Sequence, residues 1–272
     1  MSDGILYIVG TPIGNLKDIT YRAVEVLKSV DLIACEDTRH SLKLLNFYEI
    51  KKPLVSYYKE KEQYGSDKII EELLRGKTVA LITDAGMPCV SDPGSVLVLK
   101  AREHGIKIEV VPGPSAVIAA YALSGDLNNG FMFIGFLPPK NKERNLIFEQ
   151  LYNLTKPFII YSAPHDVKKD LQCIYEALGN REVVMAKELT KIHESVITGK
   201  ISQILNEQEE FKGEYVVIIK PLENKEKEYI DPKEKLNELI ALGVDKKEAI
   251  KKVSKMTGLV KDDVYKIFLE IK

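Results

Sequence analysis

The stretch VALITDAGMPCVSDPG, residues 79–94, begins as a short β-type apolar run and ends as a loop rich in glycine and proline. A buried strand in an open α/β sheet presents its carboxyl end to the ligand crevice. Glycine and proline hold the amides and carbonyls of the following loop in fixed, exposed positions. The sequence therefore predicts that this loop binds a small ligand.

The composition is that of a globular protein with a sizeable core. The chain has 272 residues, of which 45% are hydrophobic and 29% charged, and its formal net charge is -1. Such a charge gives no global attraction to nucleic acid, so a partner of that kind must bind a local patch. The three cysteines are far apart and lack Cys-x-x-Cys spacing, which indicates reduced thiols and disfavours a zinc site.

The first residues, MSDGILYIV, lack a basic region, and their apolar run is too short for a signal peptide or a membrane span. We therefore expect a cytoplasmic protein with no membrane partner.

Strand and helix patterns alternate along the first ~110 residues. Apolar runs end in turn residues at 6–9, 32–35, 79–83 and 108–111, and helical patterns lie at 21–28 and 68–75. This alternation predicts a mostly parallel sheet.

A second set of strands is expected at 131–136, 158–161, 183–186 and 215–219, with helices near 142–151 and 167–178. The sequence Pro112-Gly113-Pro114-Ser115 interrupts any continuing element, so the two sets meet there. We expect an N-terminal α/β domain over residues 1–113 and a second α/β domain over 114–222, with a ligand cleft between them.

The C-terminal part differs in kind. The charged run 223–228 is typical of an exposed linker, and three short helices are expected within residues 231–272, where Asp231, Pro232, Gly243 and Gly258 supply start and stop signals. This pattern predicts a small helix-turn-helix-like appendage. Its lysines at 246, 247, 251, 252 and 255 either form a solvated helix face or contact a phosphate backbone.

Two clusters of polar residues follow strands. Residues 36–40, EDTRH, are either a capped helix start or a place where Arg39 and His40 meet a substrate phosphate or shuttle a proton. Residues 187–194, KELTKIHE, are explained mostly by surface ion pairs. Neither cluster has metal-site or Ser/His/Asp spacing, and residues 10–15, GTPIGN, match neither a dinucleotide fingerprint nor a phosphate loop.

Five motifs occur together in one order: LYIVGTPIGNL at 6–16, EDTR at 36–39, TDAGMP with SDPG at 83–94, VPGPSA at 111–116 and KELTKIHE at 187–194. With them the chain closely resembles the ribosomal RNA small subunit methyltransferase I family of the tetrapyrrole methylase superfamily, over nearly its full length. The resemblance implies two α/β domains of tetrapyrrole-methylase type with a C-terminal helix-turn-helix-like tail, and a homodimer. It also implies S-adenosylmethionine-dependent 2′-O-methylation of a cytidine ribose in the decoding region of 16S ribosomal RNA in the small subunit.

By motif position, the resemblance places the cofactor against main-chain groups of the Gly and Pro loops and of three strand ends. The residues so implied are Pro12, Asp84, Ala85, Met87, Ser115, Ala116, Tyr161, Ser162, Ala186, Lys187, Glu214 and Tyr215. Within the first loop, residues 84–87 are expected to face the cofactor, and residues 91–94 to shape the wall where RNA enters. No metal is implied.

In-line transfer to a ribose hydroxyl is helped by a general base. The candidates for that base are Asp37, His40, Lys187 and Glu188, with Arg39 as a phosphate clamp. Two alternatives remain open: a methyltransferase for a tetrapyrrole or other small acceptor, and a non-catalytic ribosome assembly factor. The tetrapyrrole branch carries a Gly-x-Gly-x-Gly-Asp-type first loop, and GTPIGN in its place argues against a corrin precursor.

Overall fold

The computed structural model describes residues 4–222, 231–257 and 259–270, which form two compact units divided after Leu222. The linker expected at 223–228 and the helix stop expected at Gly258 lie outside the described residues. No helix in the described ranges is long and apolar enough to cross a bilayer.

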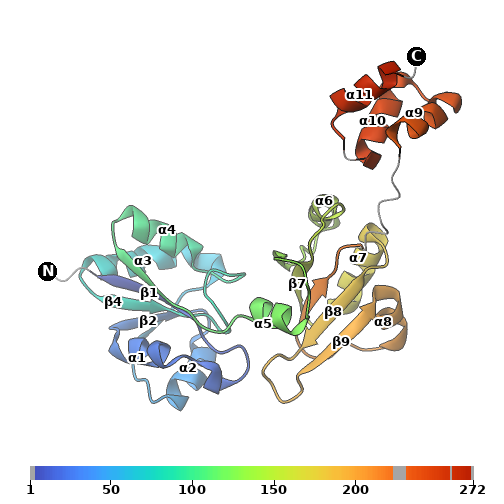
Figure 1. Ribbon diagram of the computed structural model, residues 1–272. Coiled ribbons are helices and arrows are strands. Elements are labelled where there is room, and N and C mark those ends of the chain that lie inside the picture. The colour runs from blue at the N-terminus through green and yellow to red at the C-terminus, as the bar shows by residue number, and fades with distance from the viewer. Residues whose placement is uncertain (1–3, 223–230, 258, 271–272) are drawn as a thin grey trace. The chain divides into compact units, whose positions relative to one another are not determined.

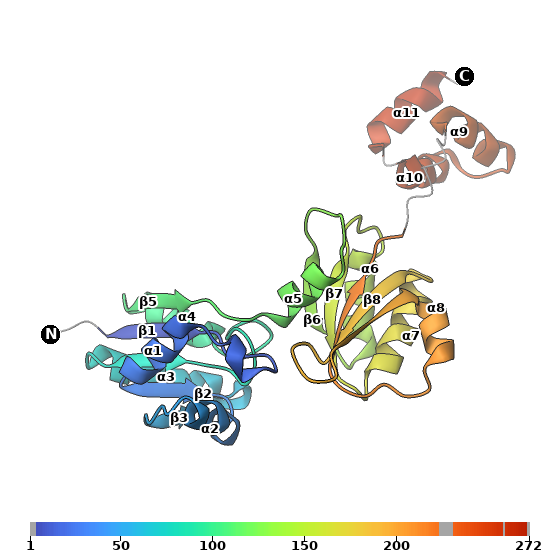
Figure 2. The same ribbon diagram turned by 60° about the horizontal axis from the view of Figure 1, so that its bottom comes forward.

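The first sheet is parallel throughout and has the order β3-β2-β4-β1-β5. Figure 2 shows β5 and β3 at its opposite edges. Its strands are β1 (Ile5–Val9), β2 (Leu32–Cys35), β3 (Leu54–Ser56), β4 (Thr78–Leu81) and β5 (Lys107–Val111). The helical elements between them are η1 (Leu16–Asp18), α1 (Tyr21–Ser29), α2 (Thr38–Phe47), η2 (Lys59–Lys61), α3 (Glu62–Leu74) and α4 (Ser95–Glu103).

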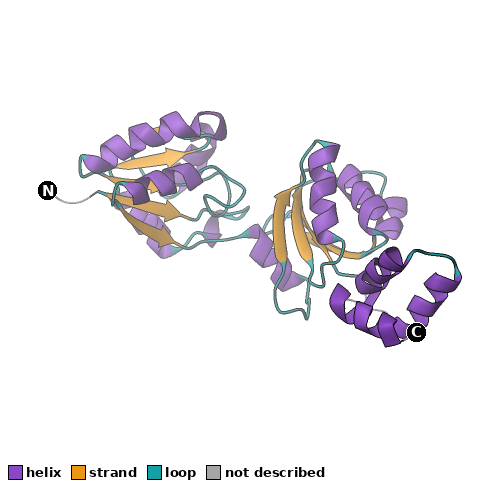
Figure 3. Ribbon diagram, turned by 90° about the horizontal axis from the view of Figure 1, so that it is seen from above, coloured by secondary structure: helices purple, strands orange, loops and turns teal. Residues whose placement is uncertain are grey.

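Helices cover both faces of this sheet (Figure 3). Alternate residues of β4 point into opposite cores: Val79 and Leu81 pack with α3 and α4, whereas Ala80 packs with α1 and α2. A strand buried on both faces reads as a continuous apolar run, which is why residues 79–82 could be recognised from sequence.

The second sheet is mixed and has the order β6-β7-β10-β8-β9, with only β6 and β7 parallel. Its strands are β6 (Met132–Phe136), β7 (Phe158–Ser162), β8 (Glu182–Lys187), β9 (Ser195–Lys200) and β10 (Tyr215–Ile219). Helices α6 (Asn141–Leu151), α7 (Val167–Leu178) and α8 (Ile201–Glu207) pack on one face, and α5 (Ala116–Leu123) on the other.

The C-terminal unit consists of α9 (Pro232–Ala241), α10 (Lys246–Thr257) and α11 (Lys261–Glu270) around a small core of its own. Asp231 caps α9 by accepting a hydrogen bond from Lys233 N, as its sequence position predicts. Lys246 lies over the rings of Tyr265 and Phe268, so part of the basic face of α10 contributes to packing.

The expected α/β class, the parallel first sheet and the three tail helices are confirmed. Strands β3 and β9 were not expected from the sequence. β3 is short and β9 lies exposed at an edge, so neither shows a buried apolar run. The boundaries proposed for the two α/β domains, 1–113 and 114–222, stay predictions.

The backbones of Gly10 and Gly113 touch at the carboxyl ends of β1 and β5. A Cβ built on Gly10 would lie 2.7 Å from the Gly113 Cα, and one on Gly113 would lie 2.8 Å from the Gly10 Cα. The Met87 sulfur could move aside, but the Gly113 backbone atoms could not, so we expect Gly10→Ala to lower the free energy of unfolding by about 1–3 kcal/mol or more in urea titrations.

Gly105→Ala is the matched control, because its φ of +67° strains alanine while no atom lies within 4 Å of the added Cβ. Gly105→Ala should lower the free energy of unfolding by about 1–2 kcal/mol through the strained φ alone. If Gly10→Ala cost less than this control, the contact between the two backbones would not be a packing constraint.

Candidate functional site

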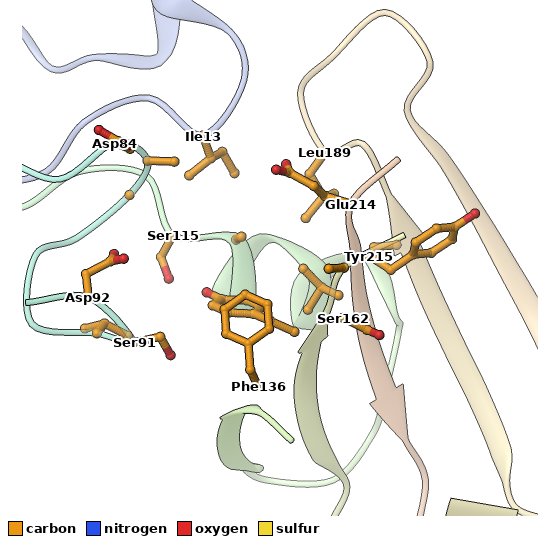
Figure 4. A pocket seen from close by; sticks show the side chains of 18 of the residues that line it. Ile13, Asp84, Ser91, Asp92, Ser115, Phe136, Ser162, Leu189, Glu214 and Tyr215 are labelled. Atoms are coloured by element: carbon orange, nitrogen blue, oxygen red, sulfur yellow. The ribbon is translucent and has the colours of Figure 1, made fainter. Parts of the chain in front are cut away.

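A cavity of about 410 Å³ lies within residues 4–222 and is lined from both sheets. Figure 4 shows residues from the loops of the first sheet on one side of it and residues of the second sheet on the other. Its position at the carboxyl ends of β1, β4 and β5 agrees with the rule for ligand sites in open α/β sheets. This cavity is called the central pocket below.

Hydrogen bonds join the loops that form the first-sheet wall. Thr11 N donates to Gly86 O at 2.8 Å, and Gly86 N donates back to Thr11 O at 3.2 Å. The Thr11 hydroxyl donates to Thr83 O at 3.1 Å and is itself buried. The loop after β4 is therefore held against the loop after β1, which fixes the backbone of residues 84–87.

The next turn of this loop is held by Glu62 of α3. Its Oε1 accepts hydrogen bonds from Gly94 N at 2.8 Å and from the Tyr57 hydroxyl at 3.1 Å. Glu62 thus supplies the acceptor for the amino end of α4, where the N-cap residue is a glycine without a side chain. Cys89 and Ser91 adopt left-handed backbone conformations here, with φ of 69° and 67°.

The second-sheet wall combines aromatic and small residues. Tyr161 and Phe136 line the cavity with their ring centroids 5.5 Å apart. The Ser162 hydroxyl donates to the buried Asp170 carboxylate at 2.7 Å, and burial raises the pKa of Asp170. The Tyr215 ring turns away from the cavity and packs against Phe211, so residue 215 presents mainly its backbone (Figure 4).

Several carboxylates face the central pocket. Burial raises the pKa of Asp92, and the charge of Asp84 adds to this effect. The pKa of Glu36 is also raised, first by burial and then by the charges of Asp92 and Asp84. Asp84 Oδ1 is buried and has no hydrogen-bond partner among the described residues. A buried acceptor without a partner is costly, but the Asp84 side chain is turned away from the central pocket (Figure 4), so residue 84 presents mainly its backbone to this cavity.

The backbone of the loop after β8 is strained, and ion pairs and a hydrogen bond hold this loop in place. Glu188 and Thr190 have φ of 50° and 65°. The Glu188 carboxylate accepts from Glu214 N at 2.8 Å, a bond that lowers the Glu188 pKa. Lys191 donates to Glu188 at 3.0 Å and to Glu214 at 2.8 Å, and it lines the pocket.

The structure brings together most of the residues that sequence reasoning assigned to the cofactor. All of them line the central pocket except Pro12, which lines an adjoining cavity, and Lys187, which ends β8 without lining either. Those in the central pocket are Asp84, Ala85, Met87, Ser115, Ala116, Tyr161, Ser162, Ala186, Glu214 and Tyr215. Residues 91 and 92, expected to shape the wall where RNA enters, also line this cavity.

The candidate catalytic residues are more dispersed. Asp37 caps α2 and pairs with Arg39 at 3.0 Å, and that contact lowers the pKa of Asp37 to about 2. His40 lines the adjoining cavity, whereas Glu188 is engaged by Glu214 N and Lys191.

Among the lining residues, sequence reasoning assigned no cofactor or catalytic role to Ile13, Glu36, Asp92, Phe136, Leu189 and Lys191. Glu36 and Asp92 lay within stretches that were singled out, 36–40 and 91–94, so distance from a strand end could have suggested them. Phe136 had no such signal. It reaches the pocket after a register shift between Phe133 and Gly135, and Gly135, at φ +77°, leaves only 2.9 Å between a built Cβ and the Ser91 hydroxyl. In the described ranges, no group of His, Cys, Asp or Glu side chains could hold a metal ion.

Residues 5–205 match the family model described as Tetrapyrrole (Corrin/Porphyrin) Methylases. Two solved structures share the fold. A diphthine synthase superposes with a TM-score of 0.65 at 16% identity, covering 80% of this chain and 90% of that one. A uroporphyrin III C-methyl transferase from Thermus thermophilus gives 0.58 at 19% identity, covering 80% and 97%.

Curated relatives are much closer in sequence, and those compared carry the name ribosomal RNA small subunit methyltransferase I. The Bacillus subtilis protein is 40% identical over 96% of this chain and 93% of its own length. The Thermotoga maritima protein is 43% identical over 79% of this chain and 98% of its own length. The chain therefore belongs to the ribosomal RNA small subunit methyltransferase I family of the tetrapyrrole methylases.

Proposed function

We propose that this protein methylates the ribose 2′-hydroxyl of a cytidine in the decoding region of 16S ribosomal RNA, with S-adenosylmethionine as methyl donor. The observation that carries the proposal is the central pocket, which stands where the family's motifs converge in a chain related over nearly its full length to rRNA small subunit methyltransferases. S-adenosylmethionine is the methyl donor of this family.

The residues present fit that cofactor. It has an amino acid end, a ribose and an adenine, and therefore needs hydrogen-bond acceptors and apolar or aromatic walls rather than a nest of basic groups. Glu36 and Asp92 supply carboxylate acceptors, and Phe136 and Tyr161 supply an aromatic wall. When bound, the cofactor supplies an electrophilic methyl group.

The chain's own contribution to the chemistry is positioning and acceptance of a proton. Of the pocket carboxylates, Asp92 points into the cavity toward Ser115, whereas Asp84 is turned away from it (Figure 4). We therefore add Asp92 to the candidate bases and favour it over Asp37, which is paired with Arg39 outside the pocket. The 2′-oxygen would form a bond to the methyl carbon as the bond from that carbon to sulfur breaks and a neutral thioether leaves, while the hydroxyl proton would pass to the Asp92 carboxylate.

The proposal is tested with small subunits isolated from cells that lack the enzyme. We expect labelled methyl groups from S-adenosylmethionine to enter the 16S RNA, and nuclease digestion with mass spectrometry to yield 2′-O-methylcytidine from the decoding region. A labelled base, or turnover only with a tetrapyrrole acceptor, would contradict the proposal. Tight RNA binding without turnover would indicate an assembly factor instead.

Phe136 should contribute to cofactor affinity. Because an aromatic contact adds about 0.5–1.5 kcal/mol to the free energy of area burial, we expect Phe136→Ala to weaken S-adenosylmethionine binding by about tenfold in calorimetric titrations. Tyr152→Ala is the control, since the Tyr152 ring is equally exposed but does not line the pocket. Equal affinities of the two variants would show that Phe136 does not contact the ligand.

Asp92 should give the reaction a pH dependence. Its raised pKa means that the carboxyl is protonated, and unable to accept a proton, at low pH. The single-turnover rate should therefore rise with pH through that pKa and then level off. Asp92→Asn should lose this rise and be slower by roughly 10²–10⁴-fold.

The stability of the same variant provides the control. The folded-state pKa of Asp92 is raised above the unfolded value of about 3.9, so the protonated carboxyl stabilises the folded state at low pH. This stabilisation is lost as the pH increases through the raised pKa. Asp92→Asn should thus be no less stable than the wild type at pH ~8. An unchanged pH profile in this folded variant would exclude Asp92 as the base.

A further inference from the structure

Two cavities adjoin the central pocket on the side of η1 and α2. The first, of about 470 Å³, shares Ile13, Asp84, Ala85, Lys191 and Glu214 with the central pocket. The second, of about 580 Å³, shares Gly14, Leu16 and Lys191 with the first. The three cavities are therefore neighbours, and the two outer ones together are called the basic trough.

The charge of the lining changes along this path. The central pocket is lined by four carboxylates and one lysine. The trough keeps two of these carboxylates, Asp84 and Glu214, and adds Lys17 and Lys43, together with the imidazoles of His40 and His193. Lys191 is paired with Glu188 and Glu214. Lys17 and Lys43 are exposed, and neither takes part in an ion pair found within the described ranges. These two ammonium groups are available to an anionic partner.

An exposed aromatic ring stands among these cations. Phe47, at the end of α2, is 56% exposed and lines the outer cavity. Its ring meets Tyr48 edge-on, with centroids 4.9 Å apart, and the Tyr48 hydroxyl donates to Leu16 O at 2.6 Å. The ring is thus braced from one side, and exposed rings near cations are the usual means of stacking unpaired bases.

Hydrogen bonds and a close backbone contact fix the loops that line the trough. Asn15 N donates to the Thr190 hydroxyl at 3.0 Å, and the Asn15 side chain accepts from Lys17 N at 3.1 Å. A Cβ on Gly14 would lie 2.6 Å from that same hydroxyl. The residues just before η1, which carries Lys17, are therefore in direct contact with the strained loop that carries Lys191 and His193.

We infer that the basic trough binds the single-stranded RNA segment next to the acceptor ribose, with Lys17 and Lys43 on phosphates and Phe47 stacked on a base. The inference rests on the proposed function and names where its substrate lies. A small acceptor would need only the central pocket. A polyanion with flat bases accounts for the exposed cations and the braced ring together.

The test measures binding of the full-length protein to a single-stranded oligoribonucleotide of decoding-region sequence between 50 and 200 mM salt, salt concentrations at which such electrostatic binding is commonly compared. Each phosphate contact on a single strand contributes a slope of about −0.7 to log K against log salt. The double variant Lys17→Ala/Lys43→Ala should therefore flatten the slope by about 1.4. Phe47→Ala should weaken binding by about tenfold, and Phe47→Tyr should restore it.

The matched control is Lys28→Ala/Lys168→Ala, which removes two exposed lysines that line none of the cavities described. Unchanged S-adenosylmethionine affinity would show that each variant is folded. An unchanged salt slope in the trough variant, or the same change in the control, would overturn the inference. If the wild type bound RNA through the trough but methylated no subunit, RNA binding by the trough would be confirmed and the proposed methyltransferase function would be wrong.

Discussion

The contact between Gly10 and Gly113 is the constraint on which the site depends. The loops after β1 and β5 approach so closely that neither position has room for a Cβ, and the Met87 sulfur lies 2.6 Å from the place of a Gly10 Cβ. The paired bonds between Thr11 and Gly86 then add the loop after β4 to the same cluster. Since these loops carry Asp84, Met87 and Ser115, the first-sheet wall of the central pocket is set by backbone packing before any ligand binds. Such preorganisation reduces the ordering cost of binding.

Backbone strain is concentrated in the two loops that form the walls of the central pocket. Of the five non-glycine residues with positive φ in the described ranges, Cys89 and Ser91 lie in one pocket loop, and Glu188 and Thr190 in the other. Left-handed conformations cost free energy and persist only where surrounding contacts impose them. Glu62 holds the first loop through Gly94 N, and the Glu188 carboxylate holds the second through Glu214 N. Both anchors are carboxylates that accept backbone hydrogen bonds, so they fix the loops without adding bulk to the cavity.

The parts of the site that could be predicted from sequence are those fixed by chain-local signals. Asp84 and Ser115 follow recognisable strands at the carboxyl edge of a sheet, and glycine and proline mark their loops. Phe136 and Lys191 could not be assigned in this way. Their positions depend on a bulge at Gly135 and on contacts between loops that are distant in sequence. When long-range packing sets the direction of a side chain, no periodic pattern in the sequence indicates it.

The formal net charge of the chain is only -1, yet the lining of the central pocket is rich in carboxylates and the adjoining trough carries exposed lysines. Carboxylates near a sulfonium donor stabilise it before reaction more than during reaction, because its positive charge disappears as the methyl group leaves. Groups that stabilise only the ground state do not accelerate a reaction. The carboxylates of the central pocket are therefore better understood as ligand acceptors and as a proton acceptor than as electrostatic catalysts. The phosphates of RNA, in contrast, are repelled by such a pocket, so a polyanionic substrate requires cations beside it, and Lys17 and Lys43 lie in the cavities that adjoin it.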